Sequence, residues 1–174
     1  AGHPGPLLLD GAHLDLLSVA LDGQPLDAGQ YAAGERQLSI AAVPEAFTLE
    51  TVARFDPWQN TRLEGFYASK DGLFSQCEAE GFRTITYFPD RPDVMATYTV
   101  TLHAARDEFP HLLANGNLVA SAEEADGRHS ATWEDPFPKP SYLFAMVAAR
   151  LDLLEDHFVT RSGRKALLQV YVEP

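Results

Sequence analysis

The sequence predicts an all-β fold of short, mostly antiparallel strands with little helix. Short runs rich in β-branched and aromatic residues recur along the 174 residues, and such runs are typical of strands. Turn-forming residue pairs separate the runs roughly every ten residues, as in a β-sandwich or a related open β architecture. Helical periodicity is nearly absent, so no layer of helices is expected over the strands.

In the first half of the chain, residues 14–21 form an apolar-rich run that the pair Asp22-Gly23 ends. Asp-Gly is a strong hairpin signal, because both positions of a tight two-residue turn need positive φ angles. Residues 37–40 predict a further strand, and residues 47–53 alternate between apolar and polar side chains as a half-buried strand does. Residues 84–88 (TITYF) predict one more strand, which Pro89 ends.

In the second half, residues 95–102 (MATYTVTL) are dense in β-branched and aromatic residues and predict a strand. The pairs Asn115-Gly116 and Asp126-Gly127 predict hairpin turns. Six strands are predicted around and after these turns, at residues 112–113, 118–120, 129–133, 142–149, 156–160 and 166–172.

Two segments of this half depart from the strand pattern. The proline-rich residues 135–140 (DPFPKP) predict an extended connector, because proline cannot donate a hydrogen bond to a central strand. Residues 104–113 are the one stretch that fits a helical turn or two, and Pro110 limits its length.

Length and composition predict one domain, spanning residues 1–174. The formal net charge of −12 argues against binding to nucleic acid or to an anionic membrane surface, because both are negatively charged and bind proteins through basic patches. Cys77 is the only cysteine, so no internal disulfide is possible and a cytoplasmic location is expected. The chain opens on AGHPGP without an initiator methionine, and we expect an excised fragment.

The stretch FSQCEAEGF at residues 74–82 has an unusual pattern. As a strand it would place Gln76, Glu78 and Glu80 on one face, because successive side chains alternate. The other face would carry only small residues, namely Ser75, Cys77, Ala79 and Gly81. On spacing alone, a solvated acidic strand face explains the pattern best. Cys77 is expected to be a buried space-filler, since neighbouring carboxylates raise the pKa of a thiol and make it a poor nucleophile.

No catalytic or metal-binding motif accompanies this stretch. The six histidines are scattered, without the spacing of a His-Glu-x-x-His helix or a cysteine pair beside them. No glycine-rich phosphate loop and no Gly-x-Ser-x-Gly elbow is present. The motifs therefore predict that this chain binds no metal and catalyses nothing by itself.

Several longer segments resemble aminopeptidase N in its bacterial alanyl aminopeptidase form. The two longest are residues 76–94 (QCEAEGFRTITYFPDRPDV) and residues 133–145 (WEDPFPKPSYLFA), and residues 158–164 (FVTRSGR) are a third. Residues 63–67 (LEGFY) and 113–117 (LANGN) add weaker support. The segments follow the order of the family and together cover the chain from about Leu14 to its end.

The resemblance implies that this chain is the saddle-like N-terminal β-domain of a zinc aminopeptidase, without its opening strands. In that family, this domain closes over a thermolysin-like zinc domain that removes N-terminal amino acids from peptides. The Gly-Ala-Met-Glu-Asn segment and the His-Glu-x-x-His helix of the family are absent here and would lie beyond Pro174. We therefore expect zinc in the full-length parent, none in this fragment, and no activity of the fragment alone.

The resemblance also assigns two substrate-binding residues. The Gln-x-Glu element of the family matches Gln76-Cys77-Glu78. It implies that Glu78 helps to hold the free α-amino group of the peptide and that Gln76 lines the pocket for the first side chain. Glu80 has no role in that scheme and is expected to be structural. The family's eukaryotic members carry a longer Phe-Pro-Cys-x-Asp-Glu-Pro element where this chain has only FPDRP, which fits the bacterial subgroup.

The alternative is a free-standing β-sandwich module that binds a carbohydrate or a protein and has no catalytic role. Such a module needs a groove with exposed aromatic side chains. Trp58, near Phe55 and Tyr67, is the one candidate for such a platform, and core packing explains it equally well.

Overall fold

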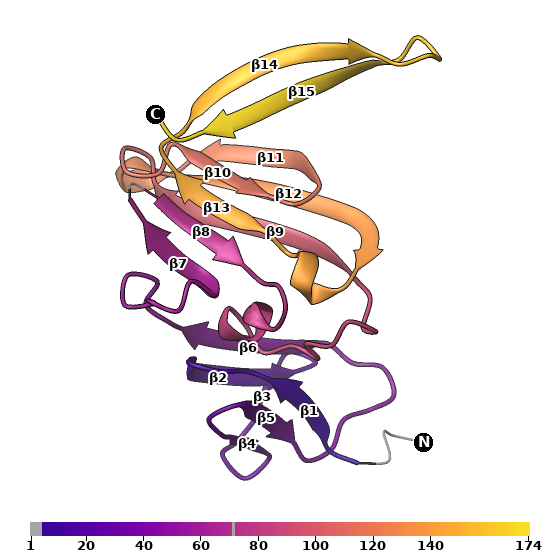
Figure 1. The fold of residues 1–174 in the computed structure, drawn as a ribbon. Coiled ribbons are helices and arrows are strands. Elements are labelled where there is room, and N and C mark those ends of the chain that lie inside the picture. The colour runs from indigo at the N-terminus through magenta and orange to yellow at the C-terminus, as the bar shows by residue number, and fades with distance from the viewer. Residues whose placement is uncertain (1–4, 71) are drawn as a thin grey trace.

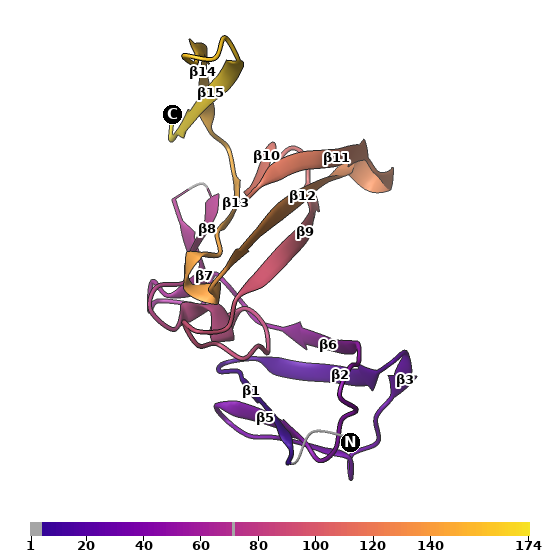
Figure 2. The same cartoon turned by 90° about the vertical axis from the view of Figure 1, so that its right-hand side faces the viewer.

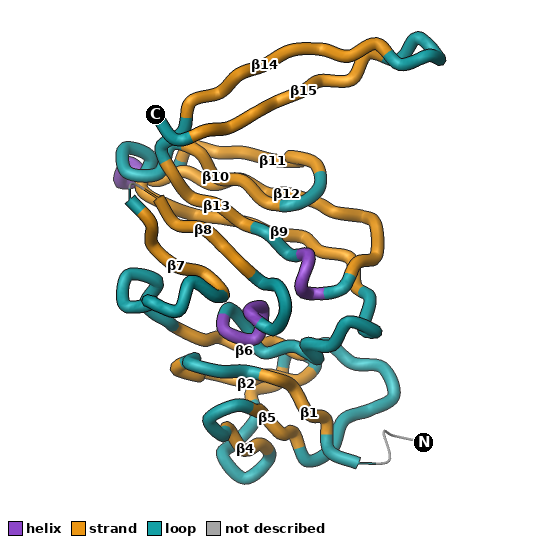
Figure 3. The backbone as a smooth tube through the Cα atoms, in the orientation of Figure 1, coloured by secondary structure: helices purple, strands orange, loops and turns teal. Residues whose placement is uncertain are grey.

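The computed structural model describes residues 5–70 and 72–174 and confirms the all-β class. Within those residues the strands form five small antiparallel sheets, and the helical segments are three short 3-10 turns. Figure 3 shows how little of the backbone is helical. None of these segments in the described part of the chain is long and apolar enough to cross a bilayer.

Two three-stranded sheets make up the N-terminal part of the molecule, drawn in indigo and purple in Figure 1. One has the order β1-β5-β4, with β1 at Leu7–Asp10, β5 at Gln37–Ile40 and β4 at Tyr31–Ala33. The other has the order β3-β2-β6, with β3 at Gln24–Pro25, β2 at Asp15–Leu21 and β6 at Leu49–Arg54. Their apolar side chains enclose one core of six buried residues: Leu9, Val19, Leu38, Ile40, Val43 and Tyr87.

Two larger sheets form the middle of the molecule. The four-stranded sheet has the order β10-β13-β8-β7, with β10 at His111–Ala114, β13 at Met146–Ala149, β8 at Gly72–Gln76 and β7 at Gly65–Ser69. The three-stranded sheet has the order β11-β12-β9, with β11 at Asn117–Glu123, β12 at Arg128–Lys139 and β9 at Ala96–Ala105. A second core lies between them and contains Leu73, Phe109, Leu112, Ala131 and Ala148.

The last two strands form a separate hairpin. Among the described residues, strands β14 (Asp152–Val159) and β15 (Lys165–Val172) pair only with each other. In Figures 1 and 2 this hairpin projects from the end of the molecule opposite β1. All eight residues of β14 are exposed, including the apolar Leu154 and Phe158. The apolar side chains of the hairpin are therefore exposed, because the rest of the described chain does not cover them.

The three 3-10 turns lie at chain reversals: η1 at Gly81–Thr84, η2 at Ala125–Gly127 and η3 at Ser141–Leu143. The turn η1 follows β8, and η3 follows β12. Both lie where the middle sheets meet the N-terminal part of the molecule (Figure 1). The candidate site is at the first of them.

Most local predictions are confirmed. Asp22 and Gly23 have φ angles of 50° and 77° and join β2 to β3 as the two central residues of a hairpin turn. The strands expected at residues 37–40, 47–53, 95–102 and 166–172 correspond to β5, β6, β9 and β15.

Several local predictions are wrong. The strand expected at residues 142–149 is confined to β13, because η3 precedes it, and the strands on either side of Asn115-Gly116 pair with other strands and not with each other. Residues 84–88 do not form a strand: η1 ends at Thr84, and only Phe88 makes a single bridge, to Asp10. Residues 135–139 belong to β12, whose pairing with β9 is interrupted after Asp135 and resumes at Lys139. This irregularity accommodates the prolines. Residues 104–113 form no helix: they span the end of β9, a connection at residues 106–110 and the start of β10, with one turn closed by the Phe109 N–H on the Ala105 carbonyl.

Candidate functional site

Gln76 and Glu78 lie at the end of β8, where the strand gives way to a tight turn. Gln76 is the last residue of β8, and residues 78–80 are in turn conformation. The Gly81 N–H donates to the Cys77 carbonyl at 2.8 Å and closes the turn. The strand alternation predicted for residues 74–82 is therefore wrong beyond Gln76, and a turn rather than a strand face presents the acidic side chains.

Two buried side chains hold this turn from either side. Cys77 is 2% exposed and Phe82 is 4% exposed, and both pack with Phe144 and Met146. The Phe82 ring lies 4.9 Å from the Phe144 ring and 6.0 Å from the Tyr98 ring, centroid to centroid, in edge-on contacts typical of aromatic cores. We call the segment from Cys77 to Phe82 the anchored turn, because its ends are buried while residues 78–80 are exposed.

Cys77 is a space-filling thiol, as predicted. Burial, together with the nearby Asp90 carboxylate, raises its pKa to about 12. The thiol is therefore protonated at neutral pH and is a poor nucleophile. Its contribution to the site is to fix the start of the anchored turn in the aromatic core.

The Glu78 side chain is exposed at the tip of the anchored turn. Among the described residues, no cationic group forms an ion pair with it. The Gln76 amide approaches the Glu78 backbone carbonyl at 3.4 Å, so the structure brings together the two residues that the sequence selected. The Glu78 carboxylate is neither sealed in the interior nor bound to an arginine of the described chain.

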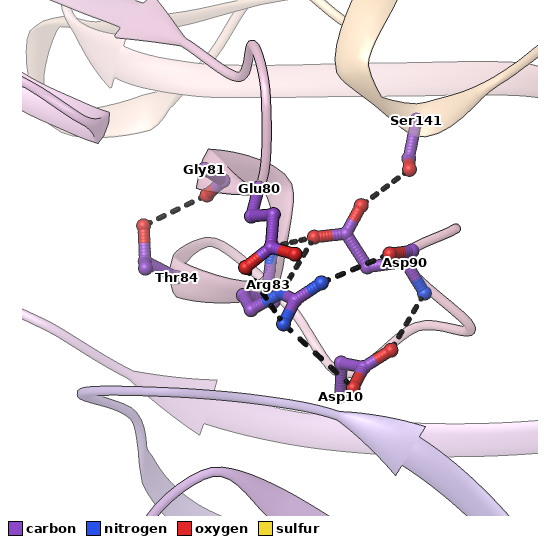
Figure 4. Close-up of polar contacts among 7 residues, drawn as sticks. All are labelled: Asp10, Glu80, Gly81, Arg83, Thr84, Asp90 and Ser141. Atoms are coloured by element: carbon purple, nitrogen blue, oxygen red, sulfur yellow. Dashed lines mark hydrogen bonds and ion pairs between the residues drawn. The ribbon is translucent and has the colours of Figure 1, made fainter. Parts of the chain in front are cut away.

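The arginine nearest in sequence to Glu78 is held by other carboxylates. Figure 4 shows the Arg83 guanidinium among Glu80, Asp10 and Asp90. Its Nε donates to Asp90 Oδ2 at 2.9 Å, and its Nη1 lies 3.3 Å from Glu80 Oε2 and 3.9 Å from Asp10 Oδ1. Glu80 thus has the structural role expected of it. Burial by itself lowers the pKa of Arg83, and the hydrogen bond to Asp90 and the three carboxylates more than offset this, so its pKa is raised.

Asp90 is the centre of this group, which we call the Arg83–Asp90 cluster (Asp10, Glu80, Arg83, Asp90 and Ser141). Its side chain is 1% exposed. Oδ2 accepts the backbone N–H of Arg83 at 3.2 Å in addition to the guanidinium, and Oδ1 accepts the hydroxyl of Ser141. The Asp90 N–H donates to Asp10 Oδ2 at 3.1 Å. A buried carboxylate with this many donors meets the requirement that buried charges be paired and hydrogen-bonded.

The sequence reasoning missed the cluster. Glu80 and Arg83 are three residues apart, a spacing that indicates a local ion pair. Asp10 and Ser141 lie 80 and 51 residues from Asp90, and no local pattern in the sequence connects them.

The described residues offer no metal site, since no group of three or more His, Cys, Asp or Glu side chains there is arranged to hold an ion. His3 lies outside the described residues. Buried His129 is engaged with protein atoms: its Nε2 donates to the Phe109 carbonyl at 2.7 Å, and its Nδ1 lies 3.2 Å from Arg106 Nη1. The side chains of this part of the chain do not fit a catalytic zinc ion.

The aromatic residues of the alternative, a carbohydrate- or protein-binding module, are gathered only in part: Phe55 and Trp58 line one open hollow. Trp58 is 61% exposed, so core packing does not explain it. Phe55, however, makes its edge-on ring contact with Phe66, at 6.4 Å between centroids, and not with Trp58. Among the described residues, Trp58 has no ring partner that would complete a flat binding surface.

Comparison with known proteins gives consistent results. The family model of the peptidase M1 N-terminal domain matches residues 13–143. The aminopeptidase N of Caulobacter vibrioides is 55% identical over 173 residues, which is 99% of this chain and 20% of the relative. The aminopeptidase N of Escherichia coli is 50% identical over 168 residues, 97% of this chain and 19% of the relative. The chain thus spans about a fifth of the length of these curated relatives.

Solved structures agree in fold. Legionella pneumophila aminopeptidase A, solved in complex with aspartic acid, superposes with a TM-score of 0.93 at 38% identity over 99% of this chain and 20% of its own. An M1 zinc metallopeptidase of Deinococcus radiodurans bound to a Tyr-Ser-Ala substrate superposes with a TM-score of 0.78 over 97% of this chain and 40% of its own. At 18% identity, the latter shows the fold alone. The match over residues 13–143 shows that the chain belongs to the family of peptidase M1 N-terminal domains.

Proposed function

We propose that this chain is the substrate-capping N-terminal domain of a zinc aminopeptidase that removes N-terminal amino acids from peptides, and that Glu78 holds the free α-amino group of the substrate. One observation carries the proposal. Glu78 projects from the anchored turn as an exposed carboxylate, while Arg83, five residues away, is occupied by Glu80, Asp10 and Asp90. The carboxylate is therefore left to bind a cation that comes from outside the domain.

A peptide α-amino group is such a cation. A carboxylate and an ammonium about 4 Å apart attract each other by roughly 4 kcal/mol at an effective dielectric constant near 20, and desolvation lowers the net value. An internal peptide nitrogen carries no charge and gains nothing from Glu78. The carboxylate would therefore select chain ends and fix the substrate's position, which is a proximity contribution to catalysis. Gln76, whose amide lies beside the Glu78 backbone, would line the pocket for the first side chain.

The partner of this domain would be the remaining four-fifths of the parent chain, with its thermolysin-like zinc domain. The β14–β15 hairpin supports such a partner, because exposed apolar side chains on an isolated two-stranded sheet are typical of a surface that another part covers. Zinc would be held entirely by that other part, since the described residues do not fit it. Zinc there would supply a Lewis acid and an activated water. The fragment alone is expected to be inactive, and a cytoplasmic location stays a prediction.

Glu78→Ala in the full-length protein tests the proposal. We expect kcat/KM for alanine p-nitroanilide to fall by about 100-fold or more, because a hydrogen-bonded ion pair contributes on the order of 3 kcal/mol. Steady-state kinetics at pH 7 would measure this.

Glu45→Ala is the matched control, because Glu45 is an exposed glutamate in the loop between β5 and β6. It should leave kcat/KM within about twofold of the original. A Glu78→Ala protein that keeps a near-original kcat/KM would remove the assignment.

A further inference from the structure

We propose that Asp90 is a positioning residue for Glu78: by binding Arg83, it fixes the anchored turn that presents the Glu78 carboxylate. The inference rests on the proposed function, because it concerns how the amine-binding carboxylate is held ready. Asp90 itself touches no substrate in this scheme, since its side chain is 1% exposed.

The first step is the direct attachment of Arg83. Asp90 Oδ2 accepts both the backbone N–H of Arg83, at 3.2 Å, and its Nε, at 2.9 Å. The Asp90 backbone carbonyl accepts Nη2 at 3.0 Å. Main chain and side chain of Arg83 are thus tied to one residue, so the carboxylate sets the position of η1 as well as the direction of the guanidinium.

The second step links η1 to Glu78. Gly81 opens η1, and its N–H closes the anchored turn on the Cys77 carbonyl. Glu80, two residues after Glu78, is drawn to Arg83 Nη1 at 3.3 Å. A side chain built on Gly81 would meet the Gln76 carbonyl oxygen at 2.3 Å, which shows how closely η1 packs against the end of β8. A shift of Arg83 would therefore move the turn that carries Glu78.

The third step is electrostatic. Arg83 is one cation among three carboxylates, those of Asp10, Glu80 and Asp90, and its side chain is only 12% exposed. Asp90 makes the most hydrogen bonds to it. Without the Asp90 charge, the guanidinium would lose its strongest partner and would no longer be held in its place beside Asp10 and Glu80. The loss of this attachment would free η1, and with it the anchored turn that carries Glu78, to shift.

The fourth step explains why Asp90 stays in place. Ser141, in η3, donates to Asp90 Oδ1, and the Asp90 N–H donates to Asp10 Oδ2 at 3.1 Å. Figure 4 shows these two contacts reaching Asp90 from opposite sides. The cluster thus joins three separate segments of the chain around the anchored turn.

The test compares two inhibitors of the full-length protein that differ only in the amino group, alanine hydroxamate and propanohydroxamic acid. The ratio of their inhibition constants measures how well the α-amino group is recognised. We expect Asp90→Asn to lower this preference for the amine by at least about tenfold, since a misplacement on the scale of 1 Å costs that much or more. The inhibition constant of propanohydroxamic acid should change by less than about twofold, because it makes no contact that Glu78 controls.

Asp93→Asn is the matched control. It makes the same charge change three residues away, at an exposed aspartate that pairs with Arg91, and should leave the preference for the amine unchanged. If Asp90→Asn does not fold, Ser141→Ala replaces it, because it removes one donor to Asp90 and keeps every charge. It should lower the amine preference by roughly threefold, through the same loss of positioning.

Glu78→Ala separates the two proposals. If it leaves the amine preference intact, the proposed function fails. If Glu78→Ala abolishes the preference while Asp90→Asn, or Ser141→Ala in its place, leaves it at the original value, only the positioning role is wrong. A variant that weakens both hydroxamates equally would also overturn the positioning role, because a merely structural defect does not distinguish the two inhibitors.

Discussion

The anchored turn and the β14–β15 hairpin are both chain reversals, and they are stabilised in opposite ways. The anchored turn is held by side chains from distant segments: Phe144 packs on Phe82, and Asp90 and Asp10 bind Arg83 just after the turn. The hairpin is held mainly by its own strand pairing. Its links to the body are near its base, where Tyr171 meets the His111 ring at 5.6 Å and Glu173 pairs with Lys70.

The difference teaches where each region has to be rigid. Under the proposed function, the Glu78 carboxylate must be fixed by packing and by hydrogen bonds around it, and the anchored turn has both. The β14–β15 hairpin, which we propose another part of the protein covers, keeps its apolar side chains exposed in this chain. Regions with few buried contacts also open most readily, so the hairpin should be the less stable of the two.

The largest difference is expected for two phenylalanine substitutions. Phe82→Ala should lower the free energy of unfolding by about 3–5 kcal/mol, because Phe82 is 4% exposed inside the aromatic core. Phe158→Ala in β14 should lower it by less than about 0.5 kcal/mol, because that side chain is 57% exposed. Urea unfolding of the 174-residue chain would measure both. Equal costs would mean that the hairpin is packed as firmly as the anchored turn.

A smaller difference is expected for two glycines. In Gly81→Ala, the new methyl group would lie 2.3 Å from the Gln76 carbonyl oxygen and 2.8 Å from the Gly65 nitrogen. Both are backbone atoms that cannot swing away, so a loss of roughly 2–3 kcal/mol is expected. Gly163→Ala in the hairpin turn meets no atom within 4 Å.

The expected cost of Gly163→Ala, about 1 kcal/mol in the free energy of unfolding, would come only from the φ angle of +83°, which disfavours a side chain. Thermal unfolding of the two variants would rank them. A Gly81→Ala protein as stable as the Gly163→Ala protein would show that η1 does not press on the end of β8.

The smallest effect is expected from the Cys77 thiol at alkaline pH. Its pKa is raised from 9.0 to about 12 in the folded chain, mainly by burial. The stability that this shift represents is fully present below pH 9 and is lost as the pH rises toward 12, because the unfolded chain releases the proton first. Between about pH 9 and pH 10 the free energy of unfolding should fall by about 1 kcal/mol.

Cys77→Ala should remove this part of the pH dependence, which denaturant unfolding at the two pH values would detect. The folded original should also react slowly with a thiol reagent at pH 8 and rapidly once unfolded. Fast labelling of the folded chain would contradict the burial of Cys77 at the start of the anchored turn.

The sequence predicted the class of fold and most strands, because those signals are local. The φ angles of Asp22 and Gly23 follow from a residue pair that tolerates them, and the alternation in β9 follows from one buried and one exposed face. The predictions failed at residues 84–88 and 135–139. At the first of these the strand-like residues Tyr87 and Phe88 are used for packing in two different cores, which takes precedence over local propensity.

The substrate-binding role of the candidate site stays a prediction. The resemblance selected Gln76 and Glu78, and the structure places them side by side. The shape of the site was not predicted, because the anchored turn depends on Phe144 and the cluster depends on Asp10 and Ser141. These residues are far from Glu78 along the chain, and a single sequence does not indicate which distant residues meet.

By itself, the sequence determined an all-β chain, the turns between its strands and the acidic residues near Cys77, since propensity, alternation and turn chemistry act over a few neighbouring residues. Only the tertiary structure decided that Glu78 would be exposed, with no ion-pair partner among the described residues, while Glu80, two residues on, would pair with Arg83. The reason is physical: Arg83 is held by Glu80, by Asp10 and most closely by the carboxylate of Asp90, and folding brings that carboxylate and its supports Ser141 and Asp10 together in a buried place.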